Sequence, residues 1–168
     1  PSLPHVYGML SNALPYVALH HRLDVPASGL MLLGLDRRVN APLAEAFREH
    51  QIQRSYVVVV LGDPGTEGEW NSSLDGKTAK TFYKRLLHHN GMSQLEVKLE
   101  TGRTHQIRRH AVGAGHPVIG DRRHGGAAGR LWKRLALHAS KLEFKHPRSG
   151  EWVQVESPYP QDLHGLMD

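Results

Sequence analysis

The sequence predicts a single α+β domain in which strands outnumber helices. Its 168 residues, 39% of them hydrophobic, are enough for one sizeable core and too few to favour two domains. Short apolar runs separated by polar and glycine-rich turns recur along the chain and indicate strands. Two stretches, residues 40–50 and 104–114, have apolar side chains at helical spacing instead.

The first elements are predicted to be two strands joined by a polar turn. Apolar residues 16–19 and 30–35 flank this turn, which contains the segment HHRLD at residues 20–24. A carboxylate held there, Asp24, can face a cleft and act as a nucleophile. Taken alone, Arg22 and Asp24 are more typical of an ion pair that closes the end of a strand.

A helix and a central strand are predicted next. Residues 40–50 indicate an amphipathic helix that is capped by Asn40 and ends near His50. The run YVVVVL at residues 56–61 is rich in β-branched side chains, as in a strand covered on both faces, and should be central. Tyr56 at its start is a natural stacking surface for an extruded base, or else a member of the core.

The second half of the chain is predicted to contain strands, a helix and two loops. Turn-forming residues indicate loops at 62–76 and 120–130, the second of them polar and mobile. A helix at 104–114 is followed by Gly115 and Pro117 as stop signals. The predicted strands, of which the first two form an antiparallel pair, cover residues 78–87, 94–99, 137–144 and 152–156.

The charge balance favours a polyanionic partner such as nucleic acid. Lysine and arginine outnumber aspartate and glutamate by 21 to 16, although a basic surface without such a partner would look the same. The chain contains no cysteine, which excludes disulfides and cysteine-ligated zinc and fits a reducing cytoplasm. No apolar run approaches the ~18 residues of a membrane helix, and residues 1–20 lack the order of a signal peptide. A soluble, cytoplasmic protein is expected.

A second candidate site is the segment TGRTHQIRRH at residues 101–110, at the start of a predicted helix. Helix N-termini favour anions, and Arg103, Arg108 and Arg109 can pair with phosphates or with a buried carboxylate. A solvated basic face would give the same pattern.

Thirteen histidines raise the alternative of a metal-dependent hydrolase. The closest group is His105, His110 and His116, whose spacing matches no recognised metal site and which lacks an adjacent carboxylate. The sequence also lacks a phosphate-binding loop, a dinucleotide fingerprint and a GxSxG elbow. Neither a metal nor another cofactor is expected.

Several blocks of sequence occur in a recognisable order. They are HRLD (21–24) with SGLMLL (28–33), GRTHQIR (102–108), HPVIGD (116–121), LHA (137–139), and FKHP (144–147) with GE (150–151) and Pro158. In this order they resemble the HRLDxxTSGLLL, GRTHQIR…HPIxGD and LHA…F.HP..GE…P patterns of RluA-type enzymes, a branch of the RluA/RsuA pseudouridine synthase family. The agreement extends from His21 to about residue 160.

The resemblance implies a mixed, largely antiparallel sheet with peripheral helices around a central RNA-binding cleft. It implies an isomerase that converts specific uridines in tRNA or rRNA to pseudouridine, with RNA as its partner and no cofactor. Residues 108–110 and the loop at 120–130 look somewhat like the tRNA-acting branch, with ribosomal RNA as the alternative. A monomer is usual for such domains. The competing interpretation is a non-catalytic RNA-binding module on the same fold.

The resemblance also implies roles for single residues. Asp24 occupies the place of the catalytic aspartate, and Arg103 that of the arginine that ion-pairs with it. Tyr56 matches the aromatic residue that packs against the target base and assists proton transfer. Arg22 matches an arginine that fills the space left by a flipped nucleotide, and Ile107 helps to wall the base pocket. The residues expected to bind RNA are Arg22, His105, Gln106, Ile107, Arg108 and Arg109.

Two points stay open at the level of sequence. Asp24 can attack the sugar to form a covalent adduct, or act as a base toward a glycal intermediate. Ala27 replaces the usual threonine of the signature, and the NKPxG-like strand of the family is absent before Pro1. Residues 1–168 are therefore expected to form one catalytic domain that lacks its N-terminal strand, without an S4-like RNA-binding domain.

Overall fold

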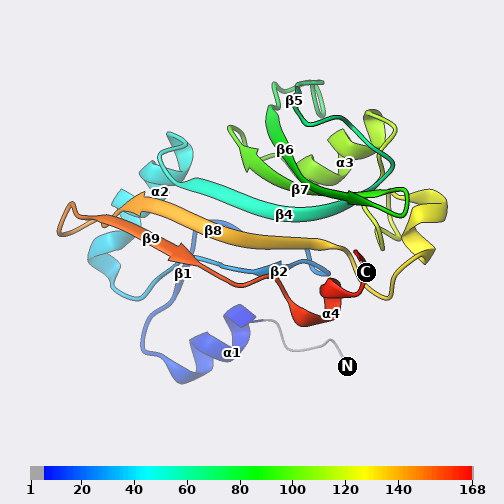
Figure 1. Ribbon diagram of the computed structural model, residues 1–168. Helices are drawn as coiled ribbons and strands as arrows, with labels where there is room; N and C mark the ends of the chain where they lie inside the picture. Colours follow the sequence, from blue (N-terminus) through cyan, green and yellow to red (C-terminus); the bar gives the residue numbers. More distant parts are fainter. Residues whose placement is uncertain (1–5, 168) are drawn as a thin grey trace.

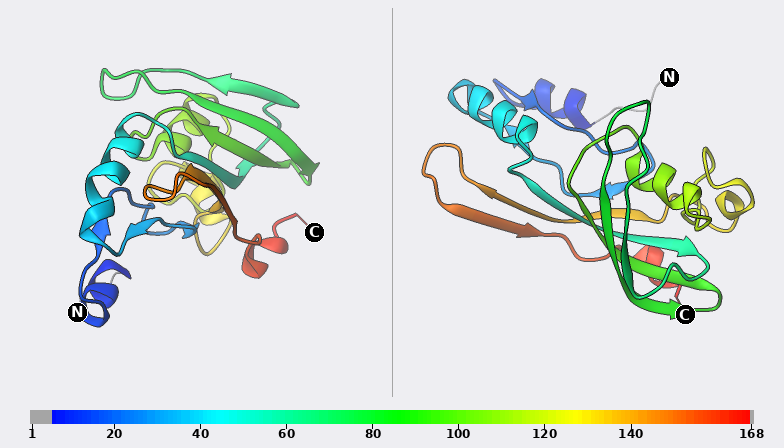
Figure 2. Two further views of the ribbon diagram at one scale, coloured as in Figure 1. Left: turned by 90° about the vertical axis from the view of Figure 1, so that its left-hand side faces the viewer. Right: turned by 90° about the horizontal axis from the view of Figure 1, so that it is seen from above.

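One sheet organises residues 6–167, the part of the chain that the computed structural model describes (Figure 1). In spatial order its strands are β2 (Ser28–Gly29), β8 (Leu137–Lys145), β4 (Gln53–Leu61), β7 (Met92–Leu99), β6 (Thr81–His89) and β5 (Glu67–Trp70), with β9 (Trp152–Glu156) also paired to β8. Strand β2 runs parallel to β8, and the other pairs are antiparallel. The expected mixed, largely antiparallel sheet is confirmed. Figure 2 shows its twist, because β6 and β7 cross the direction of β8 and β9.

The central strand β4 is covered on both faces, as its run of valines predicts. Val58 and Val60 pack into a cluster with α3 (Gln106–Gly113), and Val59 packs on the opposite face with α4 (Gln161–His164). All three valines are fully buried. Side chains alternate between the two faces of a strand, so a continuous apolar run requires a cover on each face. Helix α4 is too short to give a periodic signal and was not predicted.

The N-terminal strands are short and hold the polar turn between them. β1 (Ala18–Leu19) pairs antiparallel with β3 (Leu33–Gly34), which confirms the predicted pair. Strand β2, within the turn, lies against β8, and Gly29 there has a φ of 109°. A Cβ atom at Gly29 would lie 2.2 Å from the carbonyl oxygen of Ala139, so only glycine fits. This contact fixes the turn that contains Asp24 to the sheet.

The helix predicted at residues 40–50 is present as α2 (Asn40–Arg48), but the predicted cap is wrong. A 3₁₀ turn, Arg37–Val39, leads directly into α2, and Asp36 caps this turn by accepting a hydrogen bond from the Arg38 N–H at 2.9 Å. Asn40 is therefore already inside continuous helical structure. The residue that caps the start of the helical segment is Asp36, four residues before Asn40.

Two predicted loops contain regular structure. Strand β5 lies within residues 62–76 and pairs with β6, where Trp70 and Tyr83 place their ring centroids 4.7 Å apart. A four-residue strand depends on such cross-strand packing, which local sequence does not reveal. Residues 120–130 contain a 3₁₀ helix, Gly126–Arg130, and are tied to the core through the buried Asp121. This segment is not a plain polar loop.

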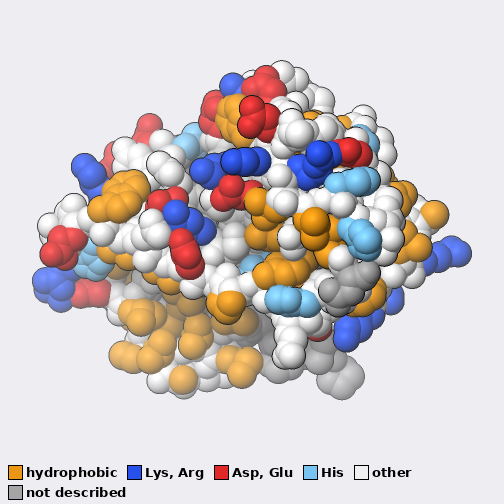
Figure 3. Space-filling model, in the orientation of Figure 1, with side chains coloured by type: hydrophobic (Ala, Val, Ile, Leu, Met, Phe, Trp, Pro, Cys, Tyr) orange, Lys and Arg blue, Asp and Glu red, His pale blue; other side chains and the backbone are white. Residues whose placement is uncertain are grey.

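Helix α1 (Val6–Ala13) contributes no buried residue. Its exposed apolar side chains form part of the hydrophobic surface at the lower left of Figure 3. Within residues 6–167, no helix combines the length and apolar character needed to cross a membrane. The N-terminal strand that the resemblance leads one to expect would precede Pro1, and so lies outside the described residues.

Candidate active site

A cleft of about 310 Å³ opens where three distant segments meet. Its walls come from the turn after β1, from the start of β4, and from the segment that leads into α3. Most of the residues singled out in the sequence line this cleft, namely Arg22, Asp24, Tyr56, Arg103, His105, Gln106, Ile107 and Arg108. The fold therefore brings the two candidate segments, 20–24 and 101–110, to one place.

The turn that contains Asp24 is held by local contacts. The Ala27 N–H donates to the Asp24 carbonyl at 2.8 Å. His21 Nε2 accepts a hydrogen bond from the Leu32 N–H at 2.8 Å, and the His21 ring stacks on Phe47 at 4.7 Å. Burial, together with the positive charge of Arg54, lowers the pKa of His21 to about 4. The ring is thus neutral at pH 7, as an acceptor must be.

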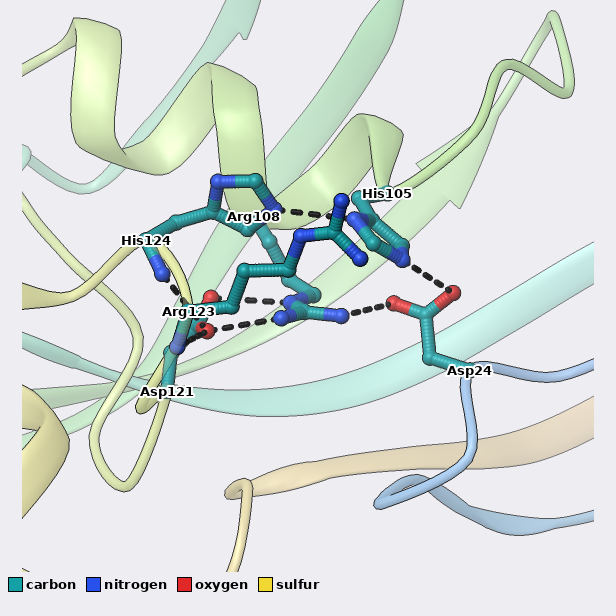
Figure 4. A network of polar contacts seen from close by, with 6 residues as sticks. All are labelled: Asp24, His105, Arg108, Asp121, Arg123 and His124. Atoms are coloured by element: carbon teal, nitrogen blue, oxygen red, sulfur yellow. Dashed lines mark hydrogen bonds and ion pairs between the residues drawn. The ribbon is translucent and has the colours of Figure 1, made fainter.

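Arg108 joins two carboxylates that are far apart in the sequence (Figure 4). Its Nε and Nη2 donate to the two oxygens of Asp121 at 2.8 and 2.7 Å, and its Nη1 donates to Oδ2 of Asp24 at 2.8 Å. The Arg108 and Asp121 side chains are 4% and 0% exposed, whereas Asp24 is 19% exposed to the cleft. Such two-pronged pairing fixes a guanidinium in direction as well as in place. Asp121 therefore orients Arg108, and Arg108 orients Asp24.

Both ends of the buried Arg108–Asp121 pair are charged at neutral pH. Burial by itself would lower the pKa of Arg108, but the hydrogen bonds that Arg108 donates to Asp121 and Asp24 outweigh it and raise that pKa. Burial likewise opposes ionisation of Asp121, but hydrogen bonds from Arg108 and from the backbone N–H groups of His124 and Arg123 lower its pKa.

The expected ion pair between Arg103 and Asp24 is wrong. Arg103 lines the cleft, but its Nε donates to the carbonyl oxygen of Thr78 at 3.0 Å. The chain turns at His105, which has a left-handed φ of 52°, and only then enters α3. Arg108 lies on the buried side of the first turn of α3 and so reaches the carboxylate. Sequence alone placed both arginines in one basic segment and did not separate them.

A histidine pair adjoins the second oxygen of Asp24. His105 Nδ1 and His124 Nε2 lie 2.8 Å apart, and His105 Nε2 lies 3.9 Å from Asp24 Oδ1 (Figure 4). Burial is the main cause that lowers the pKa of each ring, so both are neutral at pH 7. A neighbouring carboxylate favours the tautomer in which His105 carries its proton on Nε2 and accepts from His124 at Nδ1. A distance of 3.9 Å is too long for a hydrogen bond between Oδ1 and His105, and the Asp24 side chain lines the cleft.

Three other residues singled out in the sequence, Tyr56, Ile107 and Arg22, also line the cleft. The Tyr56 side chain lines the cleft and is only 8% exposed. Burial raises the pKa of its phenol, with the charge of Asp24 adding to the rise and that of Arg54 opposing it. Ile107 is buried in the same cluster and forms part of the cleft wall. Arg22 lines the cleft too, as an exposed side chain.

Two residues expected to bind RNA have other partners. Gln106 is buried, accepts from Thr101 and from the Arg103 N–H, and donates to Lys80 and Thr81 through its amide. These four hydrogen bonds use the whole amide, which leaves no group free for RNA.

Arg109 lies outside the cleft lining and pairs with Asp75 at 2.8 and 2.9 Å. Conversely, sequence reasoning missed Asp121 and His124 as site residues. Asp121 belongs to the HPVIGD block, which was the available signal. His124 had none, because it meets His105 across 19 residues.

The histidines considered as metal ligands do not converge. His110 is buried and hydrogen-bonds with Thr81 and with the Ser72 carbonyl, each at 2.9 Å. His116 hydrogen-bonds with the Leu61 carbonyl at 3.1 Å. Within residues 6–167, no three histidine, aspartate or glutamate side chains form a group that could hold a metal ion.

Sequence comparison identifies known proteins to which this chain is similar. A family model described as RNA pseudouridylate synthase matches residues 7–112, more than half of the chain. The ribosomal large subunit pseudouridine synthase D of Xanthomonas campestris pv. campestris is 34% identical, over 92% of this chain and 55% of that protein. The protein of the same name from Salmonella typhimurium is 31% identical, over 99% of this chain and 59% of that protein. The chain thus spans little more than half the length of these relatives.

Solved structures agree with the sequence comparison. Human RNA pseudouridylate synthase domain containing 1 superposes with a TM-score of 0.79 at 26% identity, over 91% of this chain and 73% of that one. Human RNA pseudouridylate synthase domain containing 4 superposes with a TM-score of 0.73 at 23% identity, over 89% and 76% of the two chains. The second likeness concerns the fold alone.

Proposed function

The chain belongs to the RNA pseudouridylate synthase family, and we propose that its cleft isomerises uridine in RNA to pseudouridine with Asp24 as the catalytic carboxylate. The observation that carries this proposal is the buried line Asp24–Arg108–Asp121. It holds Oδ2 of Asp24 by a hydrogen bond, whereas Oδ1 lies 3.9 Å from His105 on a side chain that lines the cleft. A carboxylate fixed in this way is preorganised for work at a sugar carbon.

The reaction exchanges one bond of uracil for another. The bond between ribose C1′ and uracil N1 breaks, the base turns, and a bond between C1′ and C5 forms. N1 gains a proton and C5 loses one, so the product is an isomer and no co-reactant is consumed. Oδ1 of Asp24 can attack C1′ or remove the 2′ proton, and both routes use the same geometry. Arg108 stabilises the negative charge of the Asp24 carboxylate when Asp24 is not bonded to the sugar or protonated.

The size of the cleft favours a single extruded nucleotide. Its volume of about 310 Å³ lies at the lower end of the usual range for small-ligand sites, which is about 300–1,000 Å³. A stacked uridine cannot reach a carboxylate in such a cleft, so the nucleotide must flip out at a cost of a few kcal/mol. Tyr56 and Ile107 offer apolar surface to the base. Arg22, exposed at the cleft, is available to fill the space left in the RNA.

Ribosomal RNA of the large subunit is the substrate that we propose first, because both bacterial relatives described above carry it in their names. Transfer RNA belongs in the same assay, because residues 108–110 and the segment 120–130 resemble the tRNA-acting branch of the family. A cysteine-free chain that acts on RNA is consistent with a cytoplasmic location. A monomer would suffice, because one chain supplies every group named here.

Tritium release tests the proposal directly, because the hydrogen on uracil C5 is lost when the new bond forms. Ribosomal RNA and tRNA labelled at this position would be incubated with the chain and with Asp24→Asn, which keeps the shape of the side chain. Release by the unmodified chain and a loss of at least about 10²–10⁴-fold in Asp24→Asn are expected. Equal release by both proteins would contradict the assignment of Asp24. RNA binding without release from either RNA would support a non-catalytic binding module.

A further inference from the structure

A second pocket, of about 370 Å³, lies beside the cleft. His105 and Arg108 line both cavities and form the wall between them. The other walls come from Val25 and Pro26, which follow Asp24, from residues 120–123, and from residues 133–135. A group bound here would therefore lie next to whatever occupies the cleft. We call it the basic pocket, for the reason given next.

Cations dominate the lining of the basic pocket, and three of them form no ion pair with a described residue. Arg108 is neutralised by Asp121 and Asp24, and Arg134 pairs with Asp162 at 2.6 and 2.9 Å. The remaining cations are Arg122, Arg123 and Lys133, none of which forms an ion pair with a described residue. Asp121 is the sole carboxylate in the lining as described, and Arg108 already occupies it. The pocket thus has a surplus of positive charge.

The direction of Arg123 strengthens this observation. Its side chain extends toward His105 (Figure 4), and it lines the basic pocket together with Arg108. Asp121 Oδ1 accepts from the Arg123 backbone N–H at 3.1 Å, which anchors the residue at its base. Arg108 is already neutralised by its two carboxylates, whereas the exposed Arg123 forms no ion pair with a described residue, so its charge can attract an anion. The arrangement is therefore suited to an anionic group on the ligand.

We propose that the basic pocket binds the phosphodiester that adjoins the target uridine. This inference rests on the proposed function, because RNA then supplies the anion. A ribose positioned at Asp24 has one phosphodiester on each side, within one nucleotide of the wall formed by His105 and Arg108. Arginine and lysine are the residues that bind phosphate oxygens most strongly. Val25, the exposed residue that follows Asp24, lines the pocket and brings no competing charge.

Such a site would position the RNA without reading its sequence. Contacts to phosphates set the register of a nucleic acid on a protein, whereas contacts to bases select the sequence. The basic pocket would therefore hold the backbone while the cleft receives the flipped nucleotide. Loss of Arg123 should weaken RNA binding for all sequences alike and should lessen the dependence of binding on salt.

The proposal is tested by removing the charge of a single phosphodiester in the RNA and measuring the effect on binding. A short RNA with one unpaired uridine would be prepared with the phosphodiester on the 5′ side, the 3′ side or neither replaced by an uncharged methylphosphonate. Its dissociation constant would be measured at several salt concentrations for the unmodified chain, for Arg123→Gln and for Lys133→Gln. Lys84→Gln is the matched control, because this exposed lysine loses the same charge and lines neither cavity.

The expected result is a specific coupling between protein and RNA charges. Arg123→Gln should weaken binding of the unmodified RNA by about tenfold, as for one charge-assisted hydrogen bond. It should also reduce the salt slope by roughly 0.7, the value for one single-strand phosphate. One of the two methylphosphonates removes the charge of the linkage that the pocket binds. On that RNA, Arg123→Gln should not weaken binding any further. Lys84→Gln should bind all three RNAs like the unmodified chain.

Equal weakening by Lys84→Gln, or full effects of Arg123→Gln on both modified RNAs, would overturn the proposal and leave only a general basic surface. Failure of the proposed function would look different, as binding without tritium release, and the charge coupling could still be measured. Near-ultraviolet and far-ultraviolet circular dichroism would confirm that each variant is folded.

Discussion

The cleft at Asp24 and the basic pocket share the wall formed by His105 and Arg108, but their charges are balanced differently. In the cleft, Arg108 is buried and both of its carboxylate partners are within hydrogen-bonding distance. In the basic pocket, Arg122 and Arg123 are exposed and have no carboxylate partner among residues 6–167. Paired, buried charges hold a geometry, whereas unpaired charges at the surface remain available to a ligand.

The largest expected effect is a difference in stability between variants of Arg108, in the shared wall, and Arg123, in the basic pocket. Arg108→Ala leaves Asp121 buried without its counter-charge, and the free energy of unfolding should fall by about 3–5 kcal/mol. Arg123→Ala should change it by less than about 0.5 kcal/mol, because this side chain is exposed. Urea unfolding of the two variants measures the contrast. Similar losses of unfolding free energy in the two variants would contradict a structural role for Arg108 that Arg123 does not share.

The anchoring of the Asp24 turn, which borders both cavities, gives the next effect. Gly29→Ala and Gly76→Ala both place alanine at a positive φ, of 109° and 71°, but only Gly29 meets backbone atoms. Gly29→Ala should therefore be less stable than Gly76→Ala by about 1–3 kcal/mol, the usual cost of overpacking. Turnover and RNA affinity should fall together in Gly29→Ala. Thermal unfolding and tritium release would check this, and matching values for the two variants would contradict it.

A pH-dependent effect of similar size is expected for Asp121→Asn. At pH 7 the loss of this charge-assisted pair should destabilise the protein by about 1–3 kcal/mol. The folded protein lowers the pKa of Asp121 below its ordinary value of 3.8, so the contribution is complete above pH 3.8 and is lost as the pH falls further. The stability difference between the two proteins should therefore shrink in acid. A difference that stays constant down to the lowest pH at which both fold would contradict the pairing.

The smallest effect concerns His124, whose ring holds His105 next to Asp24. His124→Phe should slow turnover about fivefold, as expected for one lost hydrogen bond, while His124→Gln keeps a donor and should retain more activity. Both ring pKa values are lowered from 6.5, so the unfolded chain binds more protons below that pH and stability falls there. The fall should be smaller in His124→Phe. An unchanged profile from pH 7.5 to 5 would show that the pair does not titrate in this way.

Features that depend on local pattern were predictable from the sequence. The run of valines identified β4 as central because a strand without polar positions must be covered on both faces. The antiparallel pair β6 and β7 and the helix α3 followed from periodicity and turn residues. The ordered motif blocks led to the cleft, where Asp24 and Tyr56 are found.

Features that depend on long-range pairing were decided by the tertiary structure. The partner of Asp24 is 84 residues away, and its choice between Arg103 and Arg108 depends on how the chain turns at His105. Strand β5 forms because its backbone pairs with the edge of β6. His124 reaches the site only because Asp121 ties its loop to Arg108. Periodicity and motifs report what each segment favours, whereas these contacts depend on which segments the sheet brings side by side.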